Sequence, residues 1–386
     1  MKIIQYCQHV LGIGHLFRSL EICRALSDHE VILVTGGPQV DTNLPEHVRE
    51  VRLPDLQMSQ EFKGLFSSQK NSTLEQIKAE RQKRLFALFE REKPDIFLVE
   101  LYPFGRKAFR FELDPVLQAL GDKELPPCGV VCSVRDILVE KEDQVKHESR
   151  AVKTLNRYFD AVLVHADPLL AQLNETFEKF DEIVIPVFYT GYIASKPAPD
   201  AGRKLRKQLQ IGADELLIIA SAGGGNVGAG LLEAVIRAFG RLGGKNRRYL
   251  KVFTGPFLAE AQFIRLSKLA ADNVTVEKFT ADFLSYLAAA DLSVSMGGYN
   301  TTMNILASKV PALVWPFPQN REQRLRAERL ADRGWLGVLG DEDLHPDRLA
   351  VRMNQMFFPS ARPTVEIDLN GAAGTAKWLE NWSELK

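Results

Sequence analysis

Residues 291–323 read DLSVSMGGYNTTMNILASKVPALVWPFPQNREQ. Two short apolar runs, 292–295 and 312–315, lie on either side of a helical pattern, and small or polar residues follow each run. This arrangement predicts two neighbouring parallel strands of an α/β sheet. Open α/β sheets bind ligands at the carboxyl ends of their strands. The stretch therefore predicts a ligand site at one edge of a sheet.

The same alternation of short apolar runs and helical patterns extends over almost the whole chain, which is typical of βαβ units. In the first half, the predicted strands are 3–6, 31–34, 96–99, 130–133, 161–164 and 183–185. In the second half, they are 216–220, 252–253, 274–276, 292–295 and 312–315. We therefore predict an α/β protein with two Rossmann-like parallel sheets.

A chain of 386 residues is long enough for two domains that each bury a core. Glycine and proline interrupt both periodicities between Thr190 and Pro199, which indicates a linker. The predicted parts are a first domain at 1–190, a linker at 191–202, a second domain at 203–370 and a C-terminal helix at 371–386. That last helix carries Trp378 and Trp382 at helical spacing, so we expect it to pack on a domain surface.

A long charged stretch in the first half, residues 75–91, has partial helical spacing of its apolar residues. It predicts an amphipathic helix on the first domain. The Ser-, Gln- and Lys-rich segment 59–72 before it predicts a mobile loop.

The charge balance excludes recruitment of nucleic acid by the molecule as a whole, because 49 basic residues equal 49 acidic ones. Met1–Tyr6 predicts a strand and lacks the features of a secretory signal. No apolar run reaches the ~18 residues that suggest a membrane span. We therefore expect a cytoplasmic protein. Its four cysteines show no paired spacing, so we expect reduced thiols, not a zinc site or disulfides.

Two glycine turns precede helical patterns, and such turns present backbone amides to anions. The first, Gly12-Ile13-Gly14-His15, has Phe17 where a dinucleotide fingerprint requires glycine. The second, residues 223–228, reads GGGNVG after the strand at 216–220. No acidic residue ends the next strand and no Lys-Ser/Thr pair follows the turn, which argues against a nicotinamide cofactor and a Walker loop. Two interpretations of the turn at 223–228 remain: it binds a diphosphate through backbone amides, or it only packs a helix on its strand.

Together, these motifs resemble the GT-B nucleotide-sugar glycosyltransferases, specifically the family of the bacterial peptidoglycan N-acetylglucosaminyltransferase. The resemblance spans nearly the whole chain. It rests on Gly12–His15 with Arg18-Ser19, Gly223–Gly225, Gly297–Thr301, Pro311 and Pro316–Ala327. It implies two Rossmann-like domains with an interdomain cleft, a nucleotide diphosphate sugar held mainly by the C-terminal half, and no resident cofactor.

The resemblance also implies which residues contact the donor. The expected diphosphate contacts are Gly223, Gly224, Gly225, Asn226, Gly297, Gly298, Asn300 and Thr301. We expect Phe279 and Thr280 to pack against the base, and Glu322 and Gln323 to reach sugar or ribose hydroxyls. Asn304 stands where the peptidoglycan enzyme has a glutamate for the ribose diol. A neutral amide there leaves nucleotides other than uridine open.

Transfer with inversion needs a base for the acceptor hydroxyl. His15 is the first candidate, since histidine titrates near neutral pH and this one opens the N-terminal helix. Glu100, at the end of the strand 96–99, is expected to orient His15, to act as the base itself, or to pair with Arg106. Gly14, Arg18 and Arg135 are the candidates on the phosphate or acceptor side.

Asp341-Glu342-Asp343 matches the D-x-D motif of metal-dependent glycosyltransferases. The simpler interpretation is that these residues form the acidic start of a helix. We therefore expect no essential metal. The leading hypothesis is transfer of a hexose or N-acetylhexosamine from a UDP-sugar to an unknown acceptor, either lipid-linked or a small molecule. A hydrolase or epimerase on the same fold, or a donor-binding subunit without catalysis, are the alternatives. Docking on a membrane stays open: Leu65, Phe66 and Phe104 are candidate surface hydrophobes, although such residues more often pack in a core or loop.

Overall fold

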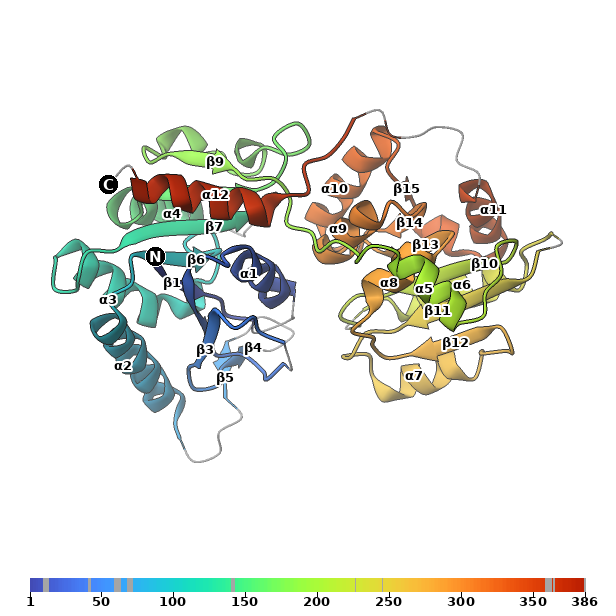
Figure 1. Cartoon of the computed structure of the whole chain (residues 1–386), viewed down its shortest axis with the longest axis horizontal. Coiled ribbons are helices and arrows are strands. Elements are labelled where there is room, and N and C mark those ends of the chain that lie inside the picture. Colours follow the sequence, from blue (N-terminus) through green and yellow to red (C-terminus); the bar gives the residue numbers. More distant parts are fainter. Residues whose placement is uncertain are drawn as a thin grey trace. The chain divides into compact units, whose positions relative to one another are not determined.

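The computed structural model of the chain describes residues 1–9, 14–40, 43–58, 64–67, 72–139, 143–225, 227–244, 246–357, 363 and 365–384. Two compact units divide the chain (Figure 1). Unit 1 comprises Met1–Ile193 and Ile367–Lys386, and unit 2 comprises Ala194–Glu366. Each unit is an α/β domain built on its own parallel sheet, which confirms the predicted fold class.

The sheet of unit 1 has seven parallel strands in the order β3-β2-β1-β6-β7-β8-β9. Their bounds are β1 Lys2–Tyr6, β2 Glu30–Thr35, β3 Val48–Arg52, β6 Ile96–Glu100, β7 Gly129–Arg135, β8 Ala161–His165 and β9 Val187–Tyr189. The central strands are buried along nearly their full length, as expected of a parallel sheet covered on both faces.

The predicted strand at 183–185 is wrong. Val184 is 78% exposed, and the edge strand β9 begins only after Pro186. An apolar run of three residues does not fix a register, and here the pairing with β8 starts at Val187. The strand β3 had no prediction, because Arg49, Glu50 and Arg52 give it the composition of a surface segment.

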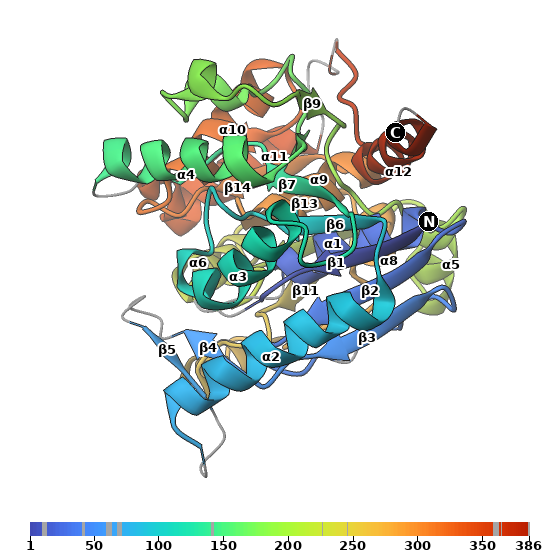
Figure 2. The same ribbon diagram turned by 90° about the vertical axis from the view of Figure 1, so that its left-hand side faces the viewer.

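Helices cover both faces of this sheet. Their bounds are α1 Gly14–Ala25, α2 Leu74–Glu92, α3 Arg110–Gly121, α4 Gln144–Tyr158 and α12 Gly371–Glu384, with short 3-10 helices at Lys107–Phe109, Leu173–Glu175 and Phe180–Glu182. Apolar residues of α1 and α12 share one core cluster with alternate residues of the strands. On the other face α2, α3 and α4 form a row (Figure 2).

The predicted charged helix is α2, and a capping box at Thr73 starts it. Most of the segment predicted as a mobile loop before it, residues 59–63 and 68–71, lies outside the described residues. Leu65–Phe66 forms β5, which pairs antiparallel with β4, Gln57–Met58.

The chain crosses between the units twice, and both crossing segments meet on unit 1. The Tyr192 amide donates to the Asp368 carbonyl at 2.8 Å, and the Gly371 amide donates to the Tyr192 carbonyl at 2.9 Å. After this junction α12 runs over unit 1 and packs against α1, so the last helix joins an element from the start of the chain (Figure 1). Trp378 and Trp382 stack there, with ring centroids 5.0 Å apart.

The sheet of unit 2 has six parallel strands in the order β12-β11-β10-β13-β14-β15. Their bounds are β10 Leu216–Ser221, β11 Arg248–Phe253, β12 Val274–Glu277, β13 Leu292–Met296, β14 Ala312–Trp315 and β15 Gly337–Val338. The helices are α5 Ala201–Gln208, α6 Ala229–Phe239, α7 Glu260–Ser267, α8 Phe283–Ala289, α9 Tyr299–Ser308, α10 Arg321–Asp332 and α11 Pro346–Met356, with a 3-10 helix at Asp341–Leu344. The core is the packing of α6 and α11 on the strands.

Each sheet reverses its strand order once near its middle. In unit 1 the order reverses between β1 and β6, and in unit 2 it reverses between β10 and β13. Connections leave these neighbouring strands toward opposite faces, which opens a crevice at the carboxyl ends where α/β proteins bind ligands. In each unit, candidate residues lie at the strand ends beside its own switch point. Over the part of the chain that the structure describes, no helix is long and apolar enough to cross a membrane.

Candidate functional site

The glycine turn after β10, Gly223–Gly225, has two exposed residues and one buried residue. Gly223 and Gly224 are exposed, whereas Gly225 is buried. Gly225 has φ +88°, and a Cβ there would lie 2.5 Å from the Thr254 carbonyl oxygen. Glycine is therefore required at 225 by packing. Gly223 and Gly224 remain as the backbone surface that a ligand can approach.

A second loop, which had no prediction as a functional element, closes over this turn. It follows β11, and its Gly255 would place a Cβ 2.4 Å from the Gly223 carbonyl oxygen. The Phe257 amide donates to the Gly224 carbonyl at 3.0 Å. The Phe257 ring is 45% exposed beside Gly224. The sequence signal was the Thr254-Gly255 pair at a strand end, and the exposed aromatic ring next to it is the new feature.

The turn after β13 lies across the switch point from the turn after β10. Gly298 is the N-cap of α9 and has no side-chain cap, and a Cβ on it would meet nothing within 4 Å. A Cβ on Gly223 would lie 3.8 Å from the Thr301 hydroxyl oxygen. The first turn of α9 thus faces the glycine turn after β10. Amides at a helix N-terminus with no internal partner suit a phosphate.

The other predicted donor residues occupy varied positions. Phe279 is 55% exposed, and Thr280, Asn300 and Asn304 are half-buried. Glu322 is buried at 5% exposure. The Gln323 side chain accepts from the Phe317 amide at 3.1 Å, so it holds the loop after β14. Asn226 lies outside the described residues.

These positions predict opposite phenotypes for two neighbouring glycine turns. Gly298→Val should remove nucleotide binding with little change in stability, because the added side chain enters open space in front of the helix amides. Gly225→Ala should instead destabilise unit 2, because its Cβ meets backbone atoms in a left-handed conformation. Calorimetric titration with UDP and urea unfolding of both variants check this. Normal UDP affinity in Gly298→Val would remove the α9 terminus from the site.

In unit 1 the switch point brings together His15, at the start of α1, and Glu100, at the end of β6. His15 Nδ1 lies 2.6 Å from Glu100 Oε1, and Arg18 Nη2 donates to the same oxygen at 2.5 Å. Glu100 is 1% exposed and Arg18 is 4% exposed, whereas the His15 side chain is 23% exposed. An ionised carboxylate only accepts, so Nδ1 carries the proton and Nε2 is the basic nitrogen of the ring.

Arg106 completes the group, with its Nε 3.5 Å from Glu100 Oε2. Burial lowers the pKa of His15 to about 3; Glu100 opposes that shift, whereas Arg106 and Arg18 add to it. Burial raises the pKa of Glu100, but His15, Arg106 and Arg18 outweigh that effect and hold it well below its usual range. Two arginines against one carboxylate leave the group cationic without a proton on His15. His15 is therefore neutral at pH 7, the form a base requires.

This charge state makes a testable prediction about pH. A free histidine is half-protonated near pH 6.5, whereas His15 should stay neutral down to about pH 3. The unfolded chain takes up this proton first, so the contribution of His15 to stability falls as pH drops from about 6.5 toward 3. Ring nitrogen chemical shifts from NMR, followed from pH 8 to the acid limit of folding, measure it. A titration of His15 near pH 6.5 would contradict the assignment.

The remaining predicted residues of unit 1 lie at the same sheet edge. Gly14 is the first residue of α1, and Arg135 ends β7, where it is half-buried. Next to it in the register is His165 at the end of β8, which is fully buried between the hydroxyls of Ser133, at 2.6 Å, and Thr190, at 2.8 Å. Sequence reasoning did not single out His165. Its neighbours mark it as a structural residue beneath the site.

The acidic triplet Asp341–Asp343 forms hydrogen bonds with neighbouring groups of unit 2. Asp341 Oδ1 accepts from Trp315 Nε1 at 3.0 Å, and Asp343 Oδ2 accepts from the Gly340 amide at 2.9 Å. Among the residues that the structure places, no three His, Cys, Asp or Glu side chains are grouped as metal ligands.

Comparison with known proteins adds to this geometry. Residues 220–377 match the family described as the glycosyltransferase family 28 C-terminal domain. A UDP-N-acetylglucosamine–N-acetylmuramyl-(pentapeptide) pyrophosphoryl-undecaprenol N-acetylglucosamine transferase of Carboxydothermus hydrogenoformans is 30% identical over 149 residues. That match covers 38% of this chain and 39% of the relative, so the chain spans about two fifths of that protein.

Two further likenesses extend over more of the chain. An uncharacterized glycosyltransferase of Methanosarcina mazei is 21% identical over 343 residues, covering 84% of this chain and 82% of that protein. The crystal structure of MurG from Acinetobacter baumannii superposes with a TM-score of 0.57 at 15% identity, over 100% of both chains. Residues 220–377 are therefore similar to the glycosyltransferase family 28 C-terminal domain, and the chain has the GT-B fold.

Proposed function

We propose that this protein is a glycosyltransferase that moves a hexose or N-acetylhexosamine from a nucleotide diphosphate sugar to an acceptor. One observation carries the proposal: the two glycine turns of the family 28 domain flank the switch point between β10 and β13, with Gly223 facing Thr301. Exposed backbone amides at a helix start bind a diphosphate without a charged side chain. The matched relative acts on a UDP-sugar by its name, which favours UDP as the nucleotide.

We assign the acceptor to unit 1, where His15 acts as the base. Its Nε2 takes the proton of the acceptor hydroxyl as the oxygen attacks the anomeric carbon and the diphosphate leaves. Glu100, at 2.6 Å from Nδ1, fixes the ring and stabilises the imidazolium that forms. Attack from the side opposite the leaving group inverts the configuration. Candidate acceptors of both kinds, small molecules and lipid-linked sugars, are compared by their effect on the rate of UDP release.

The leaving diphosphate acquires negative charge as the glycosidic bond breaks. Amides of the Gly223–Gly224 turn and the start of α9 stabilise that charge in place of a cation. We therefore propose that turnover needs no added divalent metal. Undiminished turnover in excess EDTA supports this, and recovery only on adding Mg²⁺ or Mn²⁺ contradicts it.

A thermal-shift panel tests the donor assignment directly. UDP-, GDP-, dTDP- and ADP-sugars are compared at equal concentration, because a ligand bound only by the folded state stabilises it by mass action. We expect the UDP-sugars to give the largest shift. UDP release is then measured with and without candidate acceptors. Release as fast without any acceptor assigns a hydrolase or epimerase, and binding that never leads to release assigns a donor-binding subunit.

A further inference from the structure

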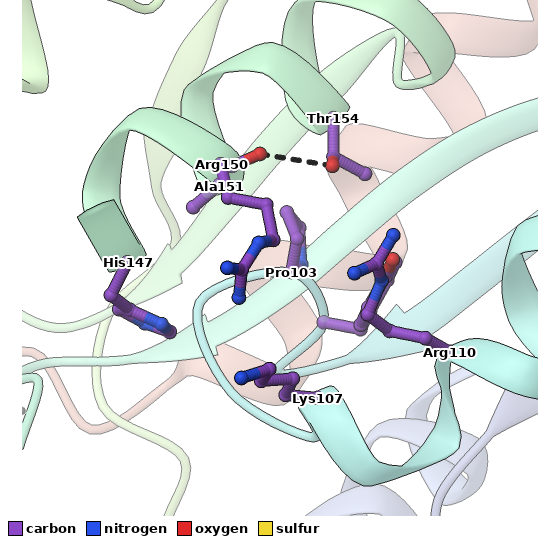
Figure 3. Close-up of a pocket in the computed structure, with 8 residues that line it drawn as sticks. Pro103, Lys107, Arg110, His147, Arg150, Ala151 and Thr154 are labelled. Carbon is purple, nitrogen blue, oxygen red and sulfur yellow. Dashed lines mark hydrogen bonds between the residues drawn. The ribbon is translucent and has the colours of Figure 1, made fainter.

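Apart from the two switch points, unit 1 has a small hollow, and half of the residues that line it are basic (Figure 3). It lies between the segment from the end of β6 to the first residue of α3 and one face of α4. The lining basic residues are Lys107, Arg110, His147 and Arg150. Figure 3 shows the Arg150 guanidinium, the Lys107 side chain and the His147 ring turned toward the same space.

The charges of this hollow are only partly neutralised. Arg110 pairs with Asp114 at 2.8 Å, and the Tyr102 hydroxyl donates to the same carboxylate. His147 bonds through Nε2 to the Phe104 carbonyl at 2.9 Å. Lys107 and Arg150 make no ion pair with any described residue. Among the residues that the structure describes, one carboxylate therefore balances three permanent cations, which leaves an excess of two positive charges.

The nearest other acidic side chain on α4 cannot supply the missing charge. Glu148 is 1% exposed and accepts from the Lys179 amide at 2.8 Å, away from the hollow. A guanidinium offers five donors in a planar fork that matches phosphate oxygens, and an ammonium beside it adds a point charge. An excess of two charges favours a dianion over a carboxylate. We infer that this hollow binds a phosphate-bearing ligand, which nothing in the proposed sugar transfer assigns to it.

Helix α4 itself supplies a matched control. Lys146, Arg150, Lys153 and Arg157 follow one another at i, i+4, i+7 and i+11, so they form one basic stripe. Only Arg150 of these lines the hollow. A general electrostatic attraction would depend equally on Lys153, whereas a built site depends on Arg150 and Lys107. The comparison of Arg150→Gln with Lys153→Gln separates the two at identical net charge.

The probe is inorganic pyrophosphate, titrated calorimetrically into the full chain at constant ionic strength, with saturating UDP present to occupy the donor turns. Arg150→Gln and Lys107→Gln should each weaken binding about tenfold or more, because each removes a charge-assisted bond. Lys153→Gln should leave it unchanged, and UDP affinity should be normal in Arg150→Gln. This pattern distinguishes the hollow from the donor site, so either assignment can fail alone.

A second arm measures flotation with vesicles of phosphatidic acid in phosphatidylcholine, with pure phosphatidylcholine vesicles as the reference. Vesicle binding that is lost in Arg150→Gln but kept in Lys153→Gln assigns a lipid headgroup, and pyrophosphate binding with the same pattern assigns a free phosphate compound. Equal losses in Arg150→Gln and Lys153→Gln overturn the site. So does the absence of binding in both arms.

Discussion

Replacing His15 with alanine is expected to lower turnover by about 10²–10⁴-fold, the usual contribution of a general base. Donor affinity should stay nearly unchanged, because the donor turns belong to unit 2 and His15 belongs to unit 1. The loss should therefore appear in kcat and kcat/KM together, as for an interaction made mainly in the transition state. Single-turnover rates, UDP affinity and melting temperature are measured on one preparation.

A second histidine of unit 1 provides the control for this experiment. His47 Nε2 bonds to the Cys23 carbonyl at 2.8 Å, a structural contact away from Glu100. His47→Ala should keep normal turnover in the protein that remains folded. His15→Ala within a few-fold of the parent would reject His15 as the base. Glu100 then becomes the candidate, and Glu100→Gln should show the loss in its place.

Arg81→Met is expected to destabilise unit 1 by about 3–5 kcal/mol, because it leaves the buried Glu112 carboxylate without its cation. Arg81 is fully buried on α2, and it donates to both Glu112 oxygens at 2.7 and 2.6 Å. It also donates to the Pro54 carbonyl at 2.7 Å and to Gln8 at 2.9 Å. One guanidinium thus holds three segments of unit 1 together.

Arg84 on the same helix is the matched control. It pairs with Glu80 at 2.6 Å, but both side chains are about half exposed. Arg84→Met should therefore cost at most about 1 kcal/mol. Urea unfolding followed by far-UV circular dichroism compares the two variants. Adding Glu112→Leu to Arg81→Met should restore part of the lost stability, since the unpaired charge is then removed. Equal costs for the two arginine variants would contradict the buried pair.

The sequence predicted the sheets well because buried parallel strands are continuous apolar runs, such as residues 216–220 and 292–295. It failed where the pattern was weak, as at residues 183–185 and at the charged strand β3. Arg81 shows another limit. It lies in a charged stretch of α2 that suggests a solvated face, and only the tertiary structure brings Glu112, from 31 residues along the chain, against it.

The candidate site was predictable to the level of strand ends but not of side-chain contacts. Glycines at the ends of β10 and β13 marked the donor edge, and His15 with Glu100 marked the corresponding edge of unit 1. Which glycine serves packing, as Gly225 does, depends on the loop after β11 that closes over it. The positions of Phe257 beside Gly224 and of Arg106 beside Glu100 likewise depend on contacts between distant segments, which spacing along the chain does not encode.

The central claim is that the two turns of unit 2 hold a nucleotide diphosphate sugar through backbone amides. Amide hydrogen exchange, measured by mass spectrometry with and without a saturating UDP-sugar, tests it most directly. Peptides covering 223–225 and 298–301 should exchange more slowly when the donor is bound, and the same peptides of Gly298→Val should show no change. Unchanged exchange in both turns, with slowing confined to other segments, would contradict the account.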